Sequence, residues 1–377
     1  MTTMTFEDAL RSTEQWISDA AVKGVSAAIW HRGEIVAEHQ AGEAQPGIPV
    51  RAGTLFALAS VSKPFTAATL MRLVEQGDLT LDMPISAIVP EFGEADDPFA
   101  DDAYPQLEAL RDHVTLRMLL SHTSGLPENA GVKRLRLRDQ PTLEHMLNVM
   151  CGVPLQDIPG TILRYSNVGP AVAARAAECA TGRDFHDLLY DEVLVPRGLM
   201  NVITKPAAAL NARIALVEDP SSEGTPVEGY NSTYWRQLGI PWGGYYGTAH
   251  DVARFAGSFI HGYVKNLDTY LAAEMITDQV HGAPGGVDSA GVRWDPGFWG
   301  LGWEVKGSKR NHWTGTLTSP QTFCHWGQSG TLVWADPTRE LALAVFGNRT
   351  VLKRPWPLSP ARWSHLSDVI VRVADQL

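Results

Sequence analysis

The sequence predicts a mixed α/β protein of the α+β type, with a central antiparallel sheet built from both chain termini and flanked by helices. Three observations predict this fold. A helix and two strands are indicated at the start of the 377-residue chain, two strands and a helix at its end, and mainly helical patterns between them. We therefore expect a sheet subdomain at 1–60 and 240–377 and an inserted, mostly helical subdomain at 61–239.

The start of the chain predicts a helix and a hairpin. Thr5 can cap a helix, Asp8 stands three residues further on as in a capping box, and apolar residues follow at helical spacing until Gly24. The segments 25–30 and 34–40 are typical of two strands joined by a short turn. The sequence thus predicts one opening amphipathic helix, followed by a hairpin.

The end of the chain has these elements in the reverse order. The segments 331–335 and 341–346 predict a second hairpin with a turn at 336–339, and the spacing of Trp363 and Leu366 predicts a closing helix. We expect the two terminal helices to cover the sheet. Helical patterns in the remaining chain, interrupted by Gly and Pro, lie at 62–76, 116–121, 142–151, 168–181, 184–193 and 249–261.

The composition argues against several classes of function. With 42 acidic and 31 basic residues, the net charge of −11 does not suit a protein that grips nucleic acid phosphates. No stretch approaches the roughly 18 apolar residues of a membrane span, and the first residues lack the features of an export signal. Because Cys151, Cys179 and Cys324 are scattered and odd in number, we expect a cytoplasmic protein without disulfides. No metal or other cofactor is expected, since the chain has no His-Glu-x-x-His motif.

The strongest chemical signal is Ser60-Val61-Ser62-Lys63, the one Ser-x-x-Lys in the chain. The motif opens an apolar helical run that ends at Gly77, so Ser60 is expected at a helix N-terminus and Lys63 one turn on, on the same face. A lysine can take the proton of a serine hydroxyl only if its pKa falls well below about 10.4. Taken alone, the motif also fits a capping serine and a surface lysine.

In its surroundings, this motif resembles the first motif of class C β-lactamases, serine DD-peptidases and family VIII carboxylesterases. Tyr165-Ser166-Asn167 is similar to the second catalytic motif, Tyr-x-Asn, and His325-Trp326-Gly327 stands where Lys-Thr-Gly or His-Thr-Gly is expected. The resemblance covers about residues 25–350 and implies a β-lactamase/DD-peptidase-like fold with its active site between the two subdomains. Segments that carry it, in chain order, are 54–63, 77–84, 114–126, 165–167, 247–255, 300–303 and 325–327.

The resemblance implies catalysis through a covalent acyl-enzyme. Ser60 would be the nucleophile, Lys63 its base or base partner, and Tyr165 a relay of protons to and from the serine and the leaving group. Asn167 would hold Lys63 or the substrate, and the backbone N–H groups of Ser60 and Gln328 would form the oxyanion hole. Whether Lys63 or Tyr165 is the general base stays open here, because the two titrate as a coupled unit.

The third motif departs from the pattern of the members that recognise β-lactams. Trp326 replaces a hydroxyl-bearing residue and His325 replaces the commoner lysine, while Gly327 is kept. An indole cannot bind a carboxylate as a threonine does, and a neutral histidine supplies little charge. The sequence therefore predicts a carboxylesterase for small or medium neutral esters. The alternatives are an amide hydrolase (D-aminopeptidase, D-amino-acid amidase, DD-peptidase or weak β-lactamase) and a catalytically silent binding protein of the same fold.

Two further expectations concern aromatic residues. Ten of the twelve tryptophans lie at or after Trp235, and six fall within 294–334, so we expect this group to contribute an apolar wall for the acyl or alcohol group, with core packing as the alternative. His122 is expected to organise the loop around Ser124 and Gly125 and not to take part directly in catalysis.

Overall fold

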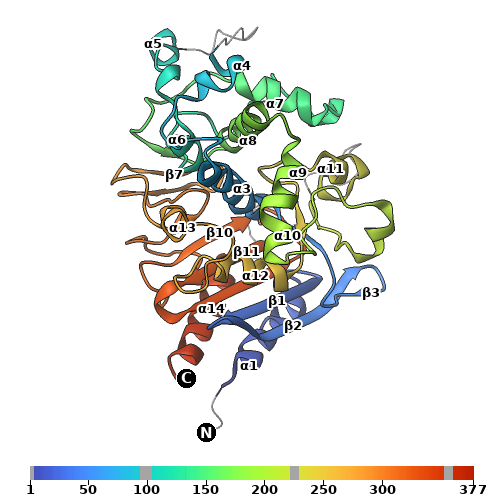
Figure 1. The fold of residues 1–377 in the computed structure, drawn as a ribbon. Helices are drawn as coiled ribbons and strands as arrows, with labels where there is room; N and C mark the ends of the chain where they lie inside the picture. The colour runs from blue at the N-terminus through green and yellow to red at the C-terminus, as the bar shows by residue number, and fades with distance from the viewer. Residues whose placement is uncertain (1–3, 94–103, 132, 221–228, 352–359) are drawn as a thin grey trace.

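The protein is described here from a computed structural model that covers residues 4–93, 104–131, 133–220, 229–351 and 360–377. Its centre is a seven-stranded antiparallel sheet with the strand order β3-β2-β1-β12-β11-β10-β9 (Figure 1). The strands are β1 (Gly24–His31), β2 (Glu34–Gln45), β3 (Ile48–Pro49), β9 (Glu304–Val305), β10 (Phe323–Gly327), β11 (Thr331–Asp336) and β12 (Leu341–Gly347).

The two chain ends meet in the middle of this sheet. β1 pairs with β12 so that Val25 lies opposite Gly347 and His31 opposite Leu341. The predicted antiparallel sheet built from both termini is therefore confirmed. Two smaller sheets join β4 (Phe56–Ala57) to β6 (Tyr246–Gly247), and β5 (Leu163–Arg164) to β7 (Gly285–Val287) and β8 (Val292–Trp294).

Helices cover both faces of the central sheet (Figure 1). Those with α-helical geometry are α1 (Phe6–Arg11), α2 (Glu14–Ser18), α3 (Ser62–Gln76), α4 (Pro90–Gly93), α5 (Pro105–Glu108), α6 (Leu116–Leu120), α7 (Leu143–Cys151), α8 (Val168–Thr181), α9 (Phe185–Leu189), α10 (Val195–Arg197), α11 (Thr233–Leu238), α12 (Ala249–Gly257), α13 (Thr269–Ile276) and α14 (Pro360–Ala374). A π-helical turn, η6 (Tyr190–Leu194), joins α9 to α10.

Every residue of β1 is buried, because both faces of the sheet are covered. On one face, Val25 and Ile29 share a core with residues of α1 and α14, so the terminal helices cover the sheet as predicted. On the other face, Ala28 and Trp30 belong to the larger core that extends into the helical part of the chain. α12 packs on β1, β11 and β12 from this second side.

The prediction of one continuous opening helix is wrong. The capping box of Thr5 and Asp8 is present and begins α1, but α1 ends at Arg11 and α2 starts only at Glu14. The Ser12 and Thr13 hydroxyls donate to the carbonyl oxygens of Ala9 and Leu10 at 2.6 Å each. These local hydrogen bonds compete with continuation of the helix, which explains the break.

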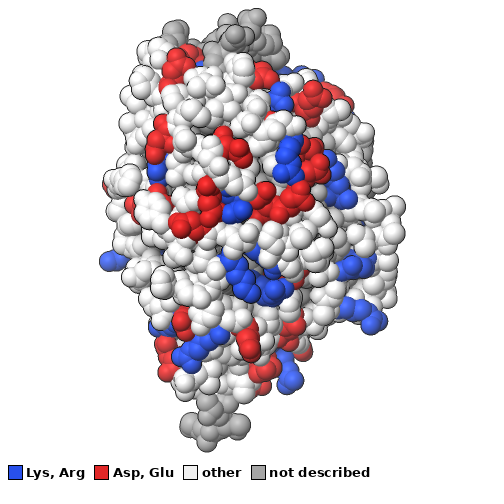
Figure 2. All heavy atoms as spheres, viewed as in Figure 1, with Lys and Arg blue, Asp and Glu red and all other residues white. Residues whose placement is uncertain are grey.

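The surface carries charges of both signs, and the three cysteines are free thiols. Figure 2 shows acidic and basic side chains mixed over one face of the molecule. Among the described residues, no helix has both the length and the apolar character needed to cross a membrane. The three cysteines are free, with Cys151 and Cys324 buried and Cys179 exposed.

Candidate active site

Ser60 lines a mainly apolar cavity. The residue belongs to a short 3₁₀ helix, η1 (Ala59–Val61), which runs directly into α3 and places the serine at a helix N-terminus. The cavity has a volume of about 410 Å³ and is also bordered by Asn167 and Gln328. The lining residues that the structure describes are all uncharged.

Strand β10 approaches the Ser60 turn closely. A Cβ atom on Gly327 would lie 2.3 Å from the Leu58 carbonyl oxygen and 3.1 Å from the Ala59 Cβ, so only glycine fits here. Ala59 itself has φ 46°, in the left-handed region that alanine rarely adopts. The close approach brings Gln328, the residue after the third motif, to the same cavity as Ser60.

Lys63 is buried beside Ser60. Its Nζ lies 3.1 Å from Ser60 Oγ, and it donates to Asn167 Oδ1 at 2.7 Å and to the Trp242 carbonyl oxygen at 2.8 Å. Removal from water lowers the pKa of Lys63 from 10.5 to about 7, while the charge of Glu128 acts in the opposite direction. The amine is therefore neutral in a large fraction of molecules near pH 7.

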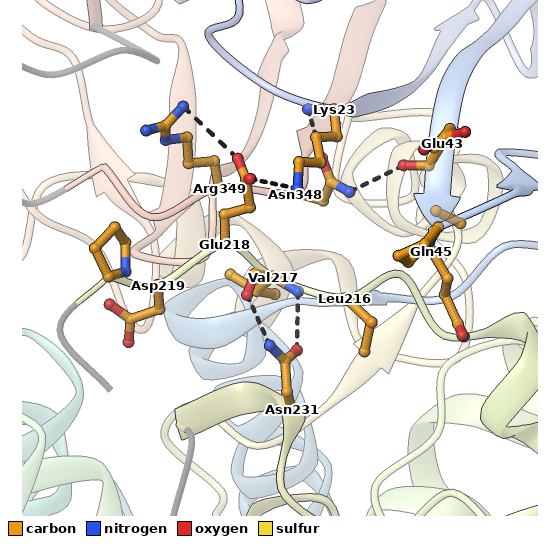
Figure 3. Close-up of a pocket in the computed structure, with 13 residues that line it drawn as sticks. Lys23, Glu43, Gln45, Leu216, Val217, Glu218, Asp219, Asn231, Asn348 and Arg349 are labelled. Carbon is orange, nitrogen blue, oxygen red and sulfur yellow. Dashed lines mark hydrogen bonds and ion pairs between the residues drawn. The ribbon is translucent and has the colours of Figure 1, made fainter. Parts of the chain in front are cut away.

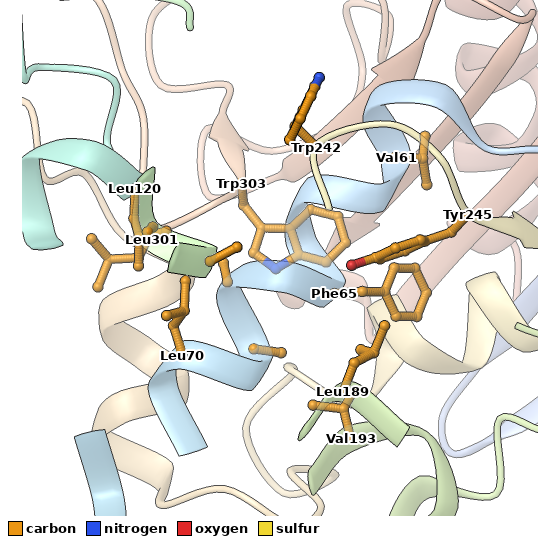
Figure 4. Close-up of a cluster of buried hydrophobic side chains, with 14 of the residues drawn as sticks. Val61, Phe65, Leu70, Leu120, Leu189, Val193, Trp242, Tyr245, Leu301 and Trp303 are labelled. Atoms are coloured by element: carbon orange, nitrogen blue, oxygen red, sulfur yellow. The ribbon is translucent and has the colours of Figure 1, made fainter. Parts of the chain in front are cut away.

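The helix that carries Lys63 is held by aromatic packing. Figure 4 shows Phe65, Tyr245 and Trp303 gathered around α3. Phe65 stacks on Phe255 with 3.8 Å between ring centroids, and Trp303 is 5.9 Å from Phe255. Gly302 has φ 83°, and a Cβ there would meet the Ala67 Cβ at 2.3 Å, so this glycine lets the chain approach α3. Such packing fixes the position of a functional group on the helix.

Tyr165 follows β5 and faces the same lysine. Its ring centroid is 4.8 Å from Lys63 Nζ. Burial raises the pKa of Tyr165 far above its ordinary value, although a hydrogen bond with Ser60 lowers it in part. The phenol is therefore protonated at neutral pH, whereas the Lys63 amine is neutral in only part of the molecules.

His122 supports the Tyr165 segment from behind. The His122 ring is 4.7 Å from the Tyr165 ring, and its Nδ1 accepts a hydrogen bond from the Ser166 N–H at 3.1 Å. The His122 carbonyl oxygen accepts from the Arg164 N–H at 2.8 Å. His122 therefore supports the loop that carries the second motif, and its expected role in its own loop stays a prediction.

The third motif places its side chains on opposite sides of β10. The His325 ring centroid is 6.1 Å from that of Tyr165, and burial with the nearby Lys63 charge lowers the pKa of His325 to about 3, so this residue is neutral. The Trp326 ring instead packs against Trp313 and Trp363 at 5.4 and 6.4 Å and does not line the Ser60 cavity. Adjacent residues of a strand point to opposite faces, so His325 and Trp326 lie on different sides of β10. The substrate-binding role expected for Trp326 stays a prediction.

The tryptophans that line the cavity are not those of the dense cluster. Trp235 and Trp242 border the cavity, whereas none of the six tryptophans within 294–334 does. Trp303 and Trp334 are instead buried core residues, and Trp299 packs edge-on against His122. Most of the expected apolar wall is thus formed by other residues. These are Ala130, Leu135, Leu137, Met146, Met150, Tyr230 and Ile240.

A buried ionic cluster lies next to the aromatic residues behind the site. Among the described residues, Glu304, His312 and Cys324 bring possible metal-ligand atoms within 4.8 Å of one another, which the sequence did not reveal. The Glu304 carboxylate already accepts from Lys309 Nζ at 2.8 Å, from Trp313 Nε1 at 2.8 Å and bonds His312 Nε2 at 3.0 Å. Burial would raise the pKa of Glu304, but Lys309 and His312 hold it below the ordinary range. The cluster is thus an ion-pair network with its own protein partners.

A second cavity, of about 280 Å³, has a mixed polar and apolar lining and does not include Ser60 (Figure 3). Of its charged groups, Glu218 pairs with Lys23 at 2.7 Å and with Arg349 at 3.6 Å. Asn231 bonds both the N–H and the carbonyl oxygen of Val217. The chemistry therefore concentrates in the cavity that contains Ser60.

Comparisons with known proteins identify the family of this chain. A family model described as Beta-lactamase matches residues 8–362. Penicillin-binding protein 4 of Amycolatopsis lactamdurans is 32% identical over 213 residues, which are 56% of this chain and 52% of that protein. Esterase EstB of Burkholderia gladioli is 33% identical over 199 residues, which are 49% of this chain and 48% of that protein. These matches span about half the length of each relative.

The fold is shared with solved structures over nearly the whole chain. The crystal structure of a family VIII carboxylesterase superposes with a TM-score of 0.76 at 20% sequence identity, covering 99% of both chains. The family model extends over most of the sequence and includes the three motifs around the Ser60 cavity. The chain therefore belongs to the beta-lactamase family, which is part of a superfamily of serine hydrolases.

Proposed function

We propose that this protein is a carboxylesterase that cleaves neutral esters through an acyl-enzyme on Ser60. The observation that carries the proposal is the contact of Ser60 Oγ with Lys63 Nζ at 3.1 Å, in a cavity whose lining residues are all uncharged. A buried lysine with a pKa of about 7 can take the proton of the serine hydroxyl at neutral pH. Lys63 is accordingly the general base in this proposal.

The proposed reaction has two halves. Ser60 Oγ attacks the ester carbonyl carbon while its proton passes to Lys63 Nζ, and the N–H groups of Ser60 and Gln328 stabilise the oxyanion. The bond to the alcohol oxygen then breaks, Tyr165 donates its phenolic proton to that oxygen, and Lys63 returns a proton to Tyr165. Water attacks the acyl-enzyme by the same route in reverse, which releases the acid and restores Ser60.

Two features support a neutral substrate over a carboxylate-bearing one. His325, at the position where a lysine is commoner in the family, is neutral because its pKa lies at about 3. Among the described residues, those that line the Ser60 cavity include no charged side chain that could pair with a carboxylate. An unpaired buried carboxylate is strongly disfavoured, since its desolvation is not compensated.

We expect a neutral ester to be preferred over its anionic counterpart of nearly equal size. The matched substrates are p-nitrophenyl methyl glutarate and p-nitrophenyl hydrogen glutarate, which differ in one remote carboxyl group. If desolvation of the carboxylate costs about 3 kcal/mol of transition-state stabilisation, kcat/KM should be about 100-fold or more higher for the methyl ester. A chromogenic cephalosporin and a D-alanyl-D-alanine peptide should be hydrolysed still more slowly. Equal rates for the two glutarates, or efficient cephalosporin hydrolysis, would contradict the proposal.

The pH dependence should follow the ionisation of Lys63. Because the lysine must be neutral to act as a base and its pKa is lowered to about 7, kcat/KM should rise with pH below 7 and reach a plateau above about 8. Ionisation of Tyr165 should not lower activity up to pH 9, since its pKa is raised. The measurement is kcat/KM for a p-nitrophenyl ester from pH 5 to 9, corrected for spontaneous hydrolysis. A flat profile would argue against a lysine base.

A further inference from the structure

The cavity lined by Ser60 combines a few polar residues with a larger apolar wall. Ser60, Asn167 and Gln328 stand at the reactive end, and the remaining wall is dominated by apolar side chains. Met146 and Met150, both on α7, are buried and border the cavity. A wall of this kind binds flexible apolar groups, because methionine side chains adapt to different shapes.

The position of the cavity relative to the catalytic groups decides which half of an ester enters it. The cavity touches Ser60 and Asn167, whereas neither Tyr165 nor His325 lines it. In the proposed mechanism the alcohol oxygen must face Tyr165 to receive its proton. The alcohol therefore leaves on the Tyr165 side, and the acyl group points into the cavity.

The volume of the cavity sets the size of the group that fits. A water-sized group occupies about 30 Å³, so a cavity of 410 Å³ holds on the order of ten such groups of a substrate. Part of these groups would lie beside the polar lining residues. We infer that this cavity is an acyl-chain subsite for unbranched, uncharged acyl groups of about six to ten carbons. The inference rests on the proposed esterase function and narrows it to medium-chain acyl esters.

The first test varies the acyl and alcohol parts separately. For p-nitrophenyl esters from acetate to laurate, each methylene that enters the cavity should raise kcat/KM about fourfold until the cavity is full. The octanoate should exceed the acetate by at least about 30-fold, and the laurate should fall below the maximum. For acetates of alcohols from ethanol to octanol, kcat/KM should change by less than about fivefold. Hydrolysis of these esters is followed by the release of acid. An equal rise in the alcohol series would place the alcohol in the cavity and overturn the inference.

The second test changes the cavity wall. Leu135 is half-buried at the wall, so Leu135→Trp fills the cavity and should lower the octanoate-to-acetate ratio at least tenfold. Met150→Ala enlarges the cavity and should move the optimum to a longer chain. Met200→Trp is the matched control, because Met200 is 55% exposed and lies outside the cavity; its chain-length profile should be unchanged.

Labelling of Ser60 by a serine-reactive phosphonate, measured by mass spectrometry, shows that each variant retains a formed site. If Ser60 is labelled but acetate is the best substrate, or Leu135→Trp leaves the ratio unchanged, the acyl-chain subsite is wrong while the esterase function stands. If no ester is hydrolysed and Ser60 stays unlabelled, the proposed function itself fails.

Discussion

Replacing Ser60 with alanine is expected to abolish ester hydrolysis, with kcat reduced by about 10⁴-fold or more, because no acyl-enzyme can form. The substitution removes one hydroxyl from the wall of a cavity and no core volume. Lys63 keeps its bonds to Asn167 and to the Trp242 carbonyl oxygen. The thermal midpoint should therefore shift by less than about 3 °C. Steady-state hydrolysis of a p-nitrophenyl ester and a thermal scan measure the two effects.

Ser62→Ala provides the matched control for this prediction. The Ser62 hydroxyl is buried two residues further on and accepts from the Tyr245 N–H at 3.2 Å, away from the cavity. Its loss should lower stability by about 1 kcal/mol while Ser60 is still labelled by the phosphonate. If Ser60→Ala keeps ester hydrolysis above a few per cent, Ser60 is not the nucleophile.

The sheet could be predicted from the two ends of the chain because hairpins carry strong local signals. Alternating or continuous apolar strands with turn residues between them define β1 and β2, and again β11 and β12. The break between α1 and α2 depends on two hydroxyl groups that bond back to the helix. Such bonds are weak competitors of helical structure, and helical periodicity alone does not reveal them.

Residue spacing alone predicts the candidate site only where its parts are local in sequence, whereas Tyr165, Asn167 and Gln328 were expected from the family resemblance. Ser60 and Lys63 are one helical turn apart, so their spacing predicts the contact. The Trp242 carbonyl oxygen, which binds Lys63, is a backbone group that any residue could supply, and no sequence pattern marks it. The cavity wall of Met146 and Met150 has the apolar character of ordinary core residues, so only the three-dimensional structure distinguishes it. Trp326 follows the site-facing His325 on the same strand, so strand alternation predicts that the two side chains lie on different faces.

The reductions in kcat/KM caused by removing the Lys63 amine and the Tyr165 hydroxyl should not multiply. Lys63→Met removes the amine and keeps most of the buried volume, and Tyr165→Phe removes only the hydroxyl. Each change should lower kcat/KM by about 10³-fold, since each interrupts the one proton path between Ser60 and the leaving alcohol. The double variant should then be within about tenfold of either single variant, because a path that is already interrupted has little more to lose.

The double-variant measurement separates a coupled pair from two independent contributions. Independent residues would give a combined loss of about 10⁶-fold, which would contradict the shared proton path inferred from the 4.8 Å between Lys63 Nζ and the Tyr165 ring. Tyr245→Phe is the matched control, because this buried phenol bonds Thr66 Oγ1 at 3.1 Å and does not line the Ser60 cavity. Its kcat/KM should stay within about threefold of the unmodified protein, even if removal of the hydrogen bond lowers the thermal midpoint.

The Lys63 and Tyr165 variants should also differ in the pH dependence of kcat/KM. Tyr165→Phe should retain the inflection near pH 7 at a lower rate, whereas Lys63→Met should lose it, because the group with the pKa of about 7 is the lysine.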